Sequence, residues 1–259
     1  MKILGIILAG GFGIRLRKYL PFSLPKCLLP CKGKPLIVNV VEKIRNLCDV
    51  VYVLVNKVHV NLYEQFMKLF NVVDDCVKII AEPTECEERK LGSVGAIYWF
   101  VKNFADVVKD FDYVLVTPCD IYFENGSELL KMLDIVVKFN QPVIAITYIH
   151  PQYVTHFGVV ELTYDVSLGV EKVVSFIEKP VKTYVGTVFT GIAVFPRELL
   201  VKEVINYVEN YKGDRDKLGN FIKYLVDEGK YTVLTHLLKI WIDVGVPELL
   251  DEYVKMCIS

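Results

Sequence analysis

The chain lacks an excess of charge of either sign. Its 259 residues include 30 Lys and Arg against 31 Asp and Glu, which leaves a formal net charge of -1. Proteins that bind nucleic acid usually present a strongly basic face, so this balance argues against that class. The partners that we expect are small molecules, with no nucleic acid among them.

Long apolar segments are also lacking. No apolar stretch reaches the roughly 18 residues that a membrane-spanning helix needs, so we expect no membrane partner and a cytoplasmic protein. The N-terminal run "MKILGIILAGG" passes directly into a glycine-rich loop, without the processed spacer of a signal peptide. This run predicts a buried first strand.

The cysteines lack the spacing of a metal site or a disulfide framework. There are seven, an odd number, and no two of them form a C-x-x-C pair. Zinc ribbons need such pairs, and disulfide frameworks usually need an even number. We therefore expect free thiols at Cys27, Cys31, Cys48, Cys76, Cys86, Cys119 and Cys257.

Short β-branched runs alternate with amphipathic segments over the first 150 residues. The expected strands are "KILGIILA", "VVYVLVN", "VKIIA", "YVLVTP" and "PVIAITYI", and the expected helices are 35–47, 61–70, 93–104 and 128–139. Apolar runs this continuous indicate strands covered on both faces. The pattern therefore predicts an α/β fold with a doubly wound, mostly parallel, Rossmann-like mixed sheet, whose ligands bind beyond the carboxyl ends of the strands.

The pattern changes after about residue 155. Shorter strands such as "FGVVEL", "EKVVSFIEKP" and "VFTGIAVF" predict a small antiparallel extension, followed by helices at 197–210 and 217–228. No flexible linker divides the chain, so we expect a single domain, 1–259, with parts 1–150 and 151–259. The charged run 85–90 is expected to be a solvated loop.

A glycine-rich loop follows the first predicted strand, in "LAGGFGIRLRKYLPFSLPK". Leu16 stands where a dinucleotide fingerprint needs its third glycine, and the Walker A pattern is absent. Adjacent glycines let backbone N–H groups approach phosphates closely. Arg15 can bind two phosphate oxygens and Lys26 can act as a point charge, so the loop predicts a triphosphate site.

The segments "LAGGFGIRL" and "PKCLLP" resemble the opening signature of the sugar-1-phosphate nucleotidylyltransferases, or nucleotide-sugar pyrophosphorylases. That signature is L-A-G-G-x-G-T-R-L followed by P-K-x-L-x-P, with Ile14 here in place of Thr. The resemblance runs nearly end to end and implies that 1–150 binds the nucleotide and 151–259 the sugar phosphate. It implies nucleotide contacts at Leu8, Ala9, Gly10, Gly11, Gly13, Arg15, Lys26, Glu82, Gly92 and Ser93, with Glu82 facing the base.

Two aspartates are the candidate metal ligands. Asp120 follows a strand in "YVLVTPCDIYF", where an aspartate is either a turn former or a ligand of hydrated Mg²⁺. The family motif there is Gly-Asp, with Cys119 in place of the glycine. "WIDVGVPELL" resembles the family's W-x-D-x-G-T-P motif, with Val246 in place of Thr. The resemblance implies that Asp120 and Asp243 come together and hold Mg²⁺.

The segment "SFIEKP" ends a predicted strand with Glu178 and Lys179. Such a pair could be a surface salt bridge. It also resembles the family's E-K-P motif, which implies that Glu178 accepts a sugar hydroxyl and Lys179 binds the sugar phosphate. The implied sugar-phosphate residues are Gly158, Glu178, Lys179, Thr190 and Gly191, and the implied catalytic residues are Arg15, Lys26, Lys179 and Asp120. His59, His150, His156 and His236 fall outside these motifs and are expected to be structural or on the surface.

The resemblance implies Mg²⁺-dependent transfer of a nucleotidyl group from an NTP to a sugar 1-phosphate. Glucose 1-phosphate with dTTP or UTP is the expected pair, and a mannose- or heptose-1-phosphate guanylyltransferase is the alternative. A non-catalytic regulatory protein that binds nucleotide sugars is another alternative, because Ile14, Cys119, Phe157 and Val246 depart from the family pattern. Assembly as a homo-oligomer would suit the family, and acetyltransferase activity is not expected.

Overall fold

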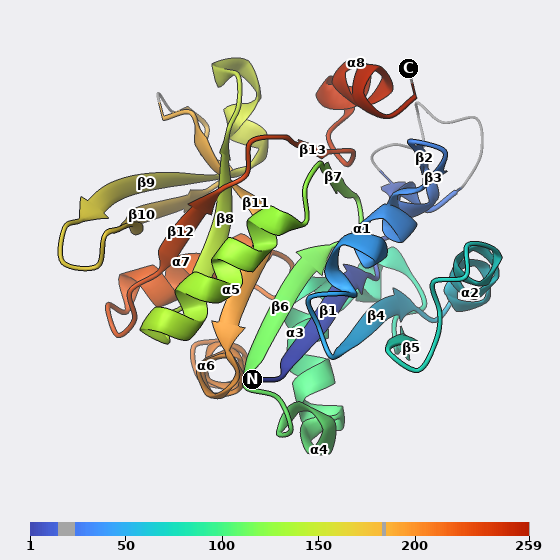
Figure 1. Ribbon diagram of the computed structural model, residues 1–259, viewed down its shortest axis with the longest axis horizontal. Coiled ribbons are helices and arrows are strands. Elements are labelled where there is room, and N and C mark those ends of the chain that lie inside the picture. Colours follow the sequence, from blue (N-terminus) through green and yellow to red (C-terminus); the bar gives the residue numbers. More distant parts are fainter. Residues whose placement is uncertain (15–23, 183–184, 259) are drawn as a thin grey trace.

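The computed structural model describes residues 1–14, 24–182 and 185–258, which form a twisted sheet between two layers of helices (Figure 1). The nine strands run in the order β5 (Val77–Glu82), β4 (Val50–Asn56), β1 (Ile3–Ala9), β6 (Tyr113–Pro118), β11 (Thr187–Pro196), β8 (Val143–Tyr148), β12 (Leu234–Leu237), β10 (Val170–Glu178) and β9 (Gly158–Asp165). The α/β fold predicted from the sequence is confirmed.

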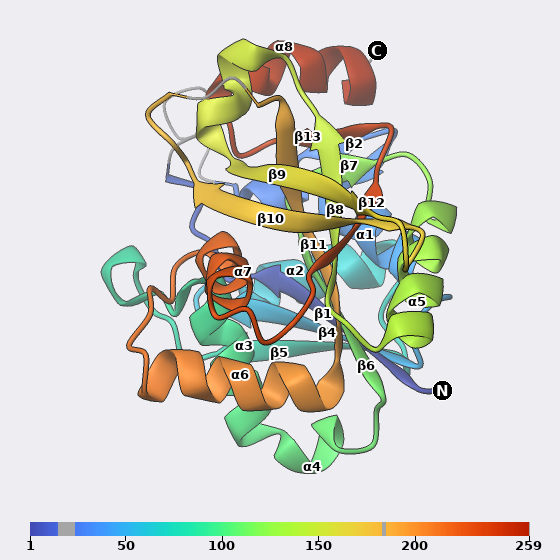
Figure 2. The same cartoon turned by 90° about the vertical axis from the view of Figure 1, so that its left-hand side faces the viewer.

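The two halves of the sheet differ in strand direction. Strands β5, β4, β1 and β6 are parallel to one another. Strand β11 is antiparallel to both of its neighbours, β6 and β8, while β12 is parallel to β8. Strands β9 and β10 form an antiparallel ribbon at the far edge, which crosses the front of the molecule in Figure 2.

Helices cover both faces of the sheet, and successive buried side chains of β1 alternate between the two faces. Ile3 and Ile7 pack in one core with α1 (Leu36–Ile44), α2 (Val60–Leu69) and α5 (Ser127–Phe139). Leu4 and Ile6 pack in a second core with α3 (Gly92–Asn103), α6 (Arg197–Glu209) and α7 (Leu218–Asp227). Two further α-helices are short, α4 (Ala105–Val108) and α8 (Leu250–Tyr253). Two cores explain why the strands are apolar along their whole length.

Two short strand pairs lie outside the main sheet. Strand β7 (Ile121–Phe123) pairs antiparallel with β13 (Trp241–Asp243), and β2 (Pro30–Cys31) pairs with β3 (Lys34–Pro35). The β7–β13 pair joins a loop from the first half of the chain to one from its C-terminal end. No helix among the described residues combines the length and apolar character needed to cross a bilayer.

The prediction that all seven cysteines are free thiols was wrong. Cys27 is bonded to Cys119, and Cys31 to Cys257, with Cα–Cα distances of 5.4 and 4.2 Å. Cys48, Cys76 and Cys86 are free. The partners are 92 and 226 residues apart in sequence, so a test based on local spacing could not identify them.

The Cys31–Cys257 disulfide is expected to stabilise the fold. It fastens the C-terminal segment to β2, where Lys32 N also donates a 2.7 Å hydrogen bond to Cys257 O. Because a cross-link restrains the unfolded chain, Cys31→Ala/Cys257→Ala should lower the free energy of unfolding by about 2–4 kcal/mol. Denaturant titration of both proteins measures the difference. Equal midpoints and slopes would contradict this role.

Candidate active site

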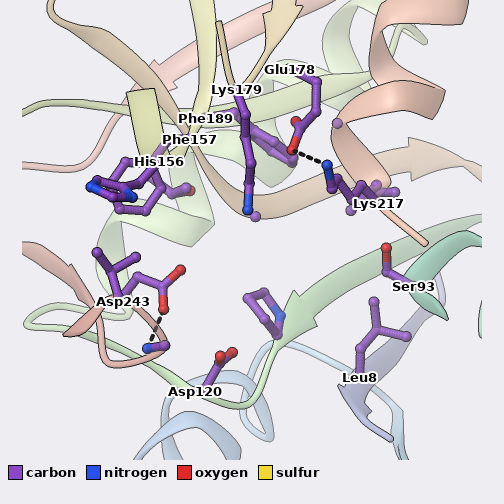
Figure 3. A pocket seen from close by; sticks show the side chains of 18 of the residues that line it. Leu8, Ser93, Asp120, His156, Phe157, Glu178, Lys179, Phe189, Lys217 and Asp243 are labelled. Carbon is purple, nitrogen blue, oxygen red and sulfur yellow. Dashed lines mark hydrogen bonds and ion pairs between the residues drawn. The ribbon is translucent and has the colours of Figure 1, made fainter. Parts of the chain in front are cut away.

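The carboxyl ends of the parallel strands meet at one edge of the sheet, and two adjoining hollows lie there. Leu8 near the end of β1, Pro118 at the end of β6, and Asp120 just beyond it line both hollows. One hollow extends over Gly10 and Glu82, and the other extends under the β9–β10 ribbon. Figure 3 shows the second, with Leu8 and Asp120 on its lower wall.

Glu82 lies in the first hollow at the end of β5. It is only 2% exposed, and its Oε2 atom has no hydrogen-bond partner among the described residues. A Cβ atom at Gly10 would clash with the Glu82 carboxylate, so glycine is required there for this close approach. Burial raises the pKa of Glu82 to about 7, although the nearby Thr84 hydroxyl opposes this shift. An unsatisfied buried acceptor facing a hollow suits a ligand that brings an N–H group.

The start of α3 forms another wall of this hollow. Ser93 N and Ser93 Oγ both donate to Asp216 O, at 3.0 and 2.9 Å. Gly92 has a φ of +73°, and a side chain there would clash with the Arg215 carbonyl. Lys90 lines the hollow and forms an ion pair of 3.1 Å with Asp216. The segment before α7 is thus fastened to the wall of the first hollow.

Asp120 and Asp243 lie together although they are far apart in sequence. Asp243 pairs with Ile121 in the β13–β7 ladder. Val244 N donates a 3.0 Å hydrogen bond to Asp120 O. Both side chains lie on the lower left of the hollow in Figure 3. The juxtaposition implied by the family resemblance is therefore present.

The two carboxylates share a space with Lys26 beside Gly245. A Cβ atom at Gly245 would lie 2.9 Å from Asp243 Oδ1 and 3.1 Å from Asp120 Oδ2. It would also lie 2.7 Å from Lys26 Nζ, and Lys26 forms an ion pair with Asp120. A side chain at position 245 would therefore fill the space that these three groups surround.

This donor set fits Mg²⁺. The ion commonly takes one or two carboxylates and completes its shell with water and substrate phosphates. Among the residues that the structure describes, no three His, Cys, Asp or Glu side chains gather as a metal cluster. Two hard oxygen donors beside an open space suit an ion that is shared with a bound phosphate, and Asp120 and Asp243 are the residues that would hold it.

The upper wall of the second hollow is built at the end of the β9–β10 ribbon. Gly158 pairs with Glu178, and Lys179 N donates a 3.0 Å hydrogen bond to Phe157 O. Lys179 has a φ of +48°, which turns the chain at the end of β10. Its side chain extends from the upper wall into the space above Asp120 (Figure 3).

Glu178 is partly buried and lies beside two lysines. Burial raises the pKa of its carboxyl, while the charges of Lys217 and Lys179 oppose that shift. Lys217 Nζ lies 3.9 Å from Glu178 Oε1. A Cβ atom at Gly158 would lie 3.0 Å from Glu178 Oε2, so the missing side chain leaves this oxygen room. Glu178 and Lys217 therefore present a hydrogen-bond acceptor and a hydrogen-bond donor to the hollow.

Aromatic rings enclose the same space. Phe157 and Trp241 are in edge-to-face contact with centroids 5.2 Å apart, and Phe189 lines the hollow with them. Thr190 is different, because its hydroxyl donates a 2.9 Å hydrogen bond to Ala145 O. Gly191, with a φ of +89°, lies against Pro118 and lines the hollow through its backbone.

Most of the residues expected at the site do line it. Arg15 lies outside the described residues. Ala9 is 1% exposed and packs in the core beneath the loop, while Gly11 lines the first hollow and, with Gly13, a third hollow beside it. The charged or titratable residues around the hollows that the sequence analysis missed are Lys90, His156, Asp216 and Lys217. They come from loops and short turns with no motif of their own.

His156 was expected to be structural or on the surface, yet it lines the second hollow. Its Nε2 lies 3.8 Å from Glu248 Oε2. The charged run 85–90 is mostly exposed, as expected, except that Lys90 also lines the first hollow. Both residues acquire their position from the tertiary fold.

The family model for nucleotidyl transferases matches residues 4–256, and the chain belongs to that family of enzymes.

Several known proteins are similar to this chain in sequence or in fold. The bifunctional protein GlmU of Methanococcus maripaludis is 29% identical over 93% of this chain and 51% of its own length. A provisionally named mannose-1-phosphate guanyltransferase of Sulfolobus acidocaldarius is 29% identical over 93% of this chain and 59% of its own. The chain thus spans between half and three-fifths of these relatives. A UDP-glucose pyrophosphorylase complexed with UDP-glucose shares the fold, with a TM-score of 0.74, 18% identity and coverage of 99% and 97% of the two chains.

Proposed function

We propose that the chain transfers a nucleotidyl group from an NTP to a sugar 1-phosphate, in an Mg²⁺-dependent reaction that releases pyrophosphate and yields an NDP-sugar. The observation that carries the proposal is the arrangement of charge around the two hollows. Asp120, Asp243 and Lys26 surround one open space, and Lys179 extends toward it from the opposite wall (Figure 3).

The reaction needs alignment more than acid or base catalysis. The attacking phosphate oxygen is already anionic, and it bonds to the α-phosphorus as the bond to the pyrophosphate oxygen breaks. Two polyanions must therefore be brought together in line against their mutual repulsion. Lys179 would hold the attacking phosphate and Lys26 the triphosphate, with Arg15 proposed for the departing pyrophosphate. Mg²⁺ held by the two aspartates would neutralise developing charge.

Glu82 is proposed to select the base. An ionised carboxylate only accepts hydrogen bonds, so it suits the imide N–H of thymine or uracil, or the N1–H and N2–H pair of guanine. Cytosine and adenine turn an unprotonated ring nitrogen toward the same position, beside their amino group. The buried Oε2 without a partner supports this role. We expect dTTP, UTP or GTP to be preferred over CTP and ATP.

Glucose 1-phosphate with dTTP or UTP is the pair that we propose first. The aromatic walls and the acceptor Glu178 suit a neutral hexose, and the structurally similar pyrophosphorylase is complexed with UDP-glucose. Mannose 1-phosphate with GTP is the second candidate. It is favoured by the name of the Sulfolobus relative and by the two carboxylate oxygens of Glu82, which match the two N–H groups of guanine.

Nucleotide affinity is expected to rise with pH through the pKa of Glu82. The carboxyl is protonated below about 7 and ionised above it. The ionised form accepts the base N–H, so affinity should increase about tenfold between about pH 6 and about pH 8. Glu82→Gln is the matched control, and its weaker affinity should be flat over this range. Calorimetric titration with the NTP measures both, and parallel profiles would contradict the role of Glu82.

The proposed function is tested by pyrophosphate release from a grid of substrates. The grid pairs dTTP, UTP, GTP, ATP and CTP with glucose, galactose, mannose, N-acetylglucosamine and heptose 1-phosphates, with Mg²⁺ or with EDTA. We expect a strong signal for one pair that disappears with EDTA. An empty grid with nucleotide still bound would instead support the regulatory protein.

A further inference from the structure

The two disulfides are formed by the two ends of the short segment Cys27–Cys31, which directly follows Lys26. Cys27 directly follows Lys26 and is bonded to Cys119, which directly precedes Asp120. Cys31 is bonded to Cys257 near the C-terminus. The first disulfide therefore joins the neighbours of two side chains that form an ion pair across the site.

The Cys27–Cys119 disulfide belongs to the wall of the first hollow, the one over Gly10 and Glu82 where we propose that the nucleotide binds. Both cysteines line that hollow, and they are 2% and 3% exposed. Cys119 is fixed to the sheet, since its N–H donates a 3.2 Å hydrogen bond to Leu8 O at the end of β1. The disulfide thus links the segment that carries Lys26, named here the lysine loop, directly to the central strands.

The lysine loop has little regular structure to hold it by itself. Lys26 begins a single 3₁₀ turn, Lys26–Leu28, closed by hydrogen bonds from Leu28 N to Pro25 O and from Leu29 N to Lys26 O. Such a turn fixes its own residues but not their distance from Asp120. The covalent link supplies that constraint, at a position where the resembling family has glycine instead of Cys119.

We propose that the Cys27–Cys119 disulfide is a positioning device that holds Lys26 beside Asp120 and so prepares the site for a triphosphate. This inference rests on the proposed function. Cys27 and Cys119 act through their neighbours, and preorganisation of a charged contact lowers the cost of binding. The Cys31–Cys257 disulfide, which lies away from both hollows, stabilises the fold without this role.

The test compares two matched double variants. Cys27→Ala/Cys119→Ala removes the positioning disulfide, and Cys31→Ala/Cys257→Ala removes the other. Peptide mapping of the unreduced protein first establishes that Cys27 is linked to Cys119. Losing one charge-assisted contact should weaken NTP binding and raise KM for the NTP about tenfold. KM for the sugar phosphate should be unchanged, and the control should keep both constants while losing thermal stability.

Reduction of the Cys31→Ala/Cys257→Ala variant tests the positioning disulfide without a change at Cys27 or Cys119, because Cys27–Cys119 is the disulfide that remains in that variant. Dithiothreitol breaks the S–S bond, each cysteine sulfur leaves as a thiol, and the reagent is oxidised to its cyclic disulfide. Reduced protein that keeps its circular dichroism spectrum should reproduce the weaker NTP binding. This arm covers the case in which the Cys27→Ala/Cys119→Ala variant does not fold.

The outcomes separate this inference from the proposed function. Free Cys27 and Cys119 thiols in the peptide map, or unchanged NTP affinity in the Cys27→Ala/Cys119→Ala variant, would overturn it. Equal weakening in both variants would also overturn it, because the effect would then be general. If the protein shows no transfer with any pair, calorimetric NTP binding still reports on the disulfide, and a tenfold loss confined to the first variant supports it.

Discussion

Asp120→Asn should lower kcat by about 10²- to 10³-fold while the protein folds normally. The substitution keeps the shape of the side chain and removes its charge. It would thereby weaken the proposed Mg²⁺ site and remove the charge that Asp120 contributes to its ion pair with Lys26. Steady-state pyrophosphate release at saturating substrates measures the loss, and circular dichroism checks the fold.

A matched aspartate controls for the charge change. Asp134 is exposed on α5, outside the hollows described above, so Asp134→Asn should keep the parent rate. Turnover by Asp120→Asn at the rate of Asp134→Asn would remove Asp120 from the mechanism.

Lys179→Ala should lower kcat/KM for the sugar phosphate by about 10²- to 10³-fold. Lys179 is held at the end of β10 by its backbone hydrogen bond to Phe157 O, and its side chain enters the hollow from there (Figure 3). Without its charge, the attacking phosphate loses the group that opposes its repulsion from the NTP. KM for the NTP should change much less.

Lys131→Ala is the control for Lys179→Ala. Lys131 is exposed on α5, so its replacement removes one positive charge without touching either hollow. If both variants kept the parent kcat/KM, Lys179 would have no part in binding the attacking phosphate.

Secondary structure was predictable because its signals are local. The helix expected at 128–139 is observed as Ser127–Phe139, and the one expected at 197–210 as Arg197–Glu209. The position of β11 was not predictable. Its segment was expected in a small antiparallel extension, and β11 does run antiparallel to its neighbours, but it lies between β6 and β8 in the middle of the main sheet. A strand buried on both faces has the same apolar pattern wherever it lies in the sheet, so nothing in its sequence indicates that position.

The site was predictable where its residues belong to short motifs. Asp120, Asp243, Glu178 and Lys179 all lie around the hollows, and their motifs identified them. Lys217 was not identified, because a lysine before a helix has no distinctive sequence and acquires its position only when α7 packs against the β9–β10 ribbon.

The cysteine prediction failed for a related physical reason. A disulfide depends on the distance between two side chains in space, and chain folding brings together residues at any separation. Cys119 did depart from the family's glycine, and that departure was the signal in the sequence. The sequence did not show which cysteine pairs with Cys119, and the structure identifies that partner as Cys27.

Phosphorus NMR of the reaction is the most direct test of nucleotidyl transfer to the sugar 1-phosphate. The NTP, the sugar 1-phosphate and Mg²⁺ are mixed with the protein, using the best pair from the substrate grid. We expect pyrophosphate and an NDP-sugar to appear in equal amounts, and only when the sugar phosphate is present. Release of orthophosphate, or pyrophosphate formed together with free NMP, would contradict nucleotidyl transfer.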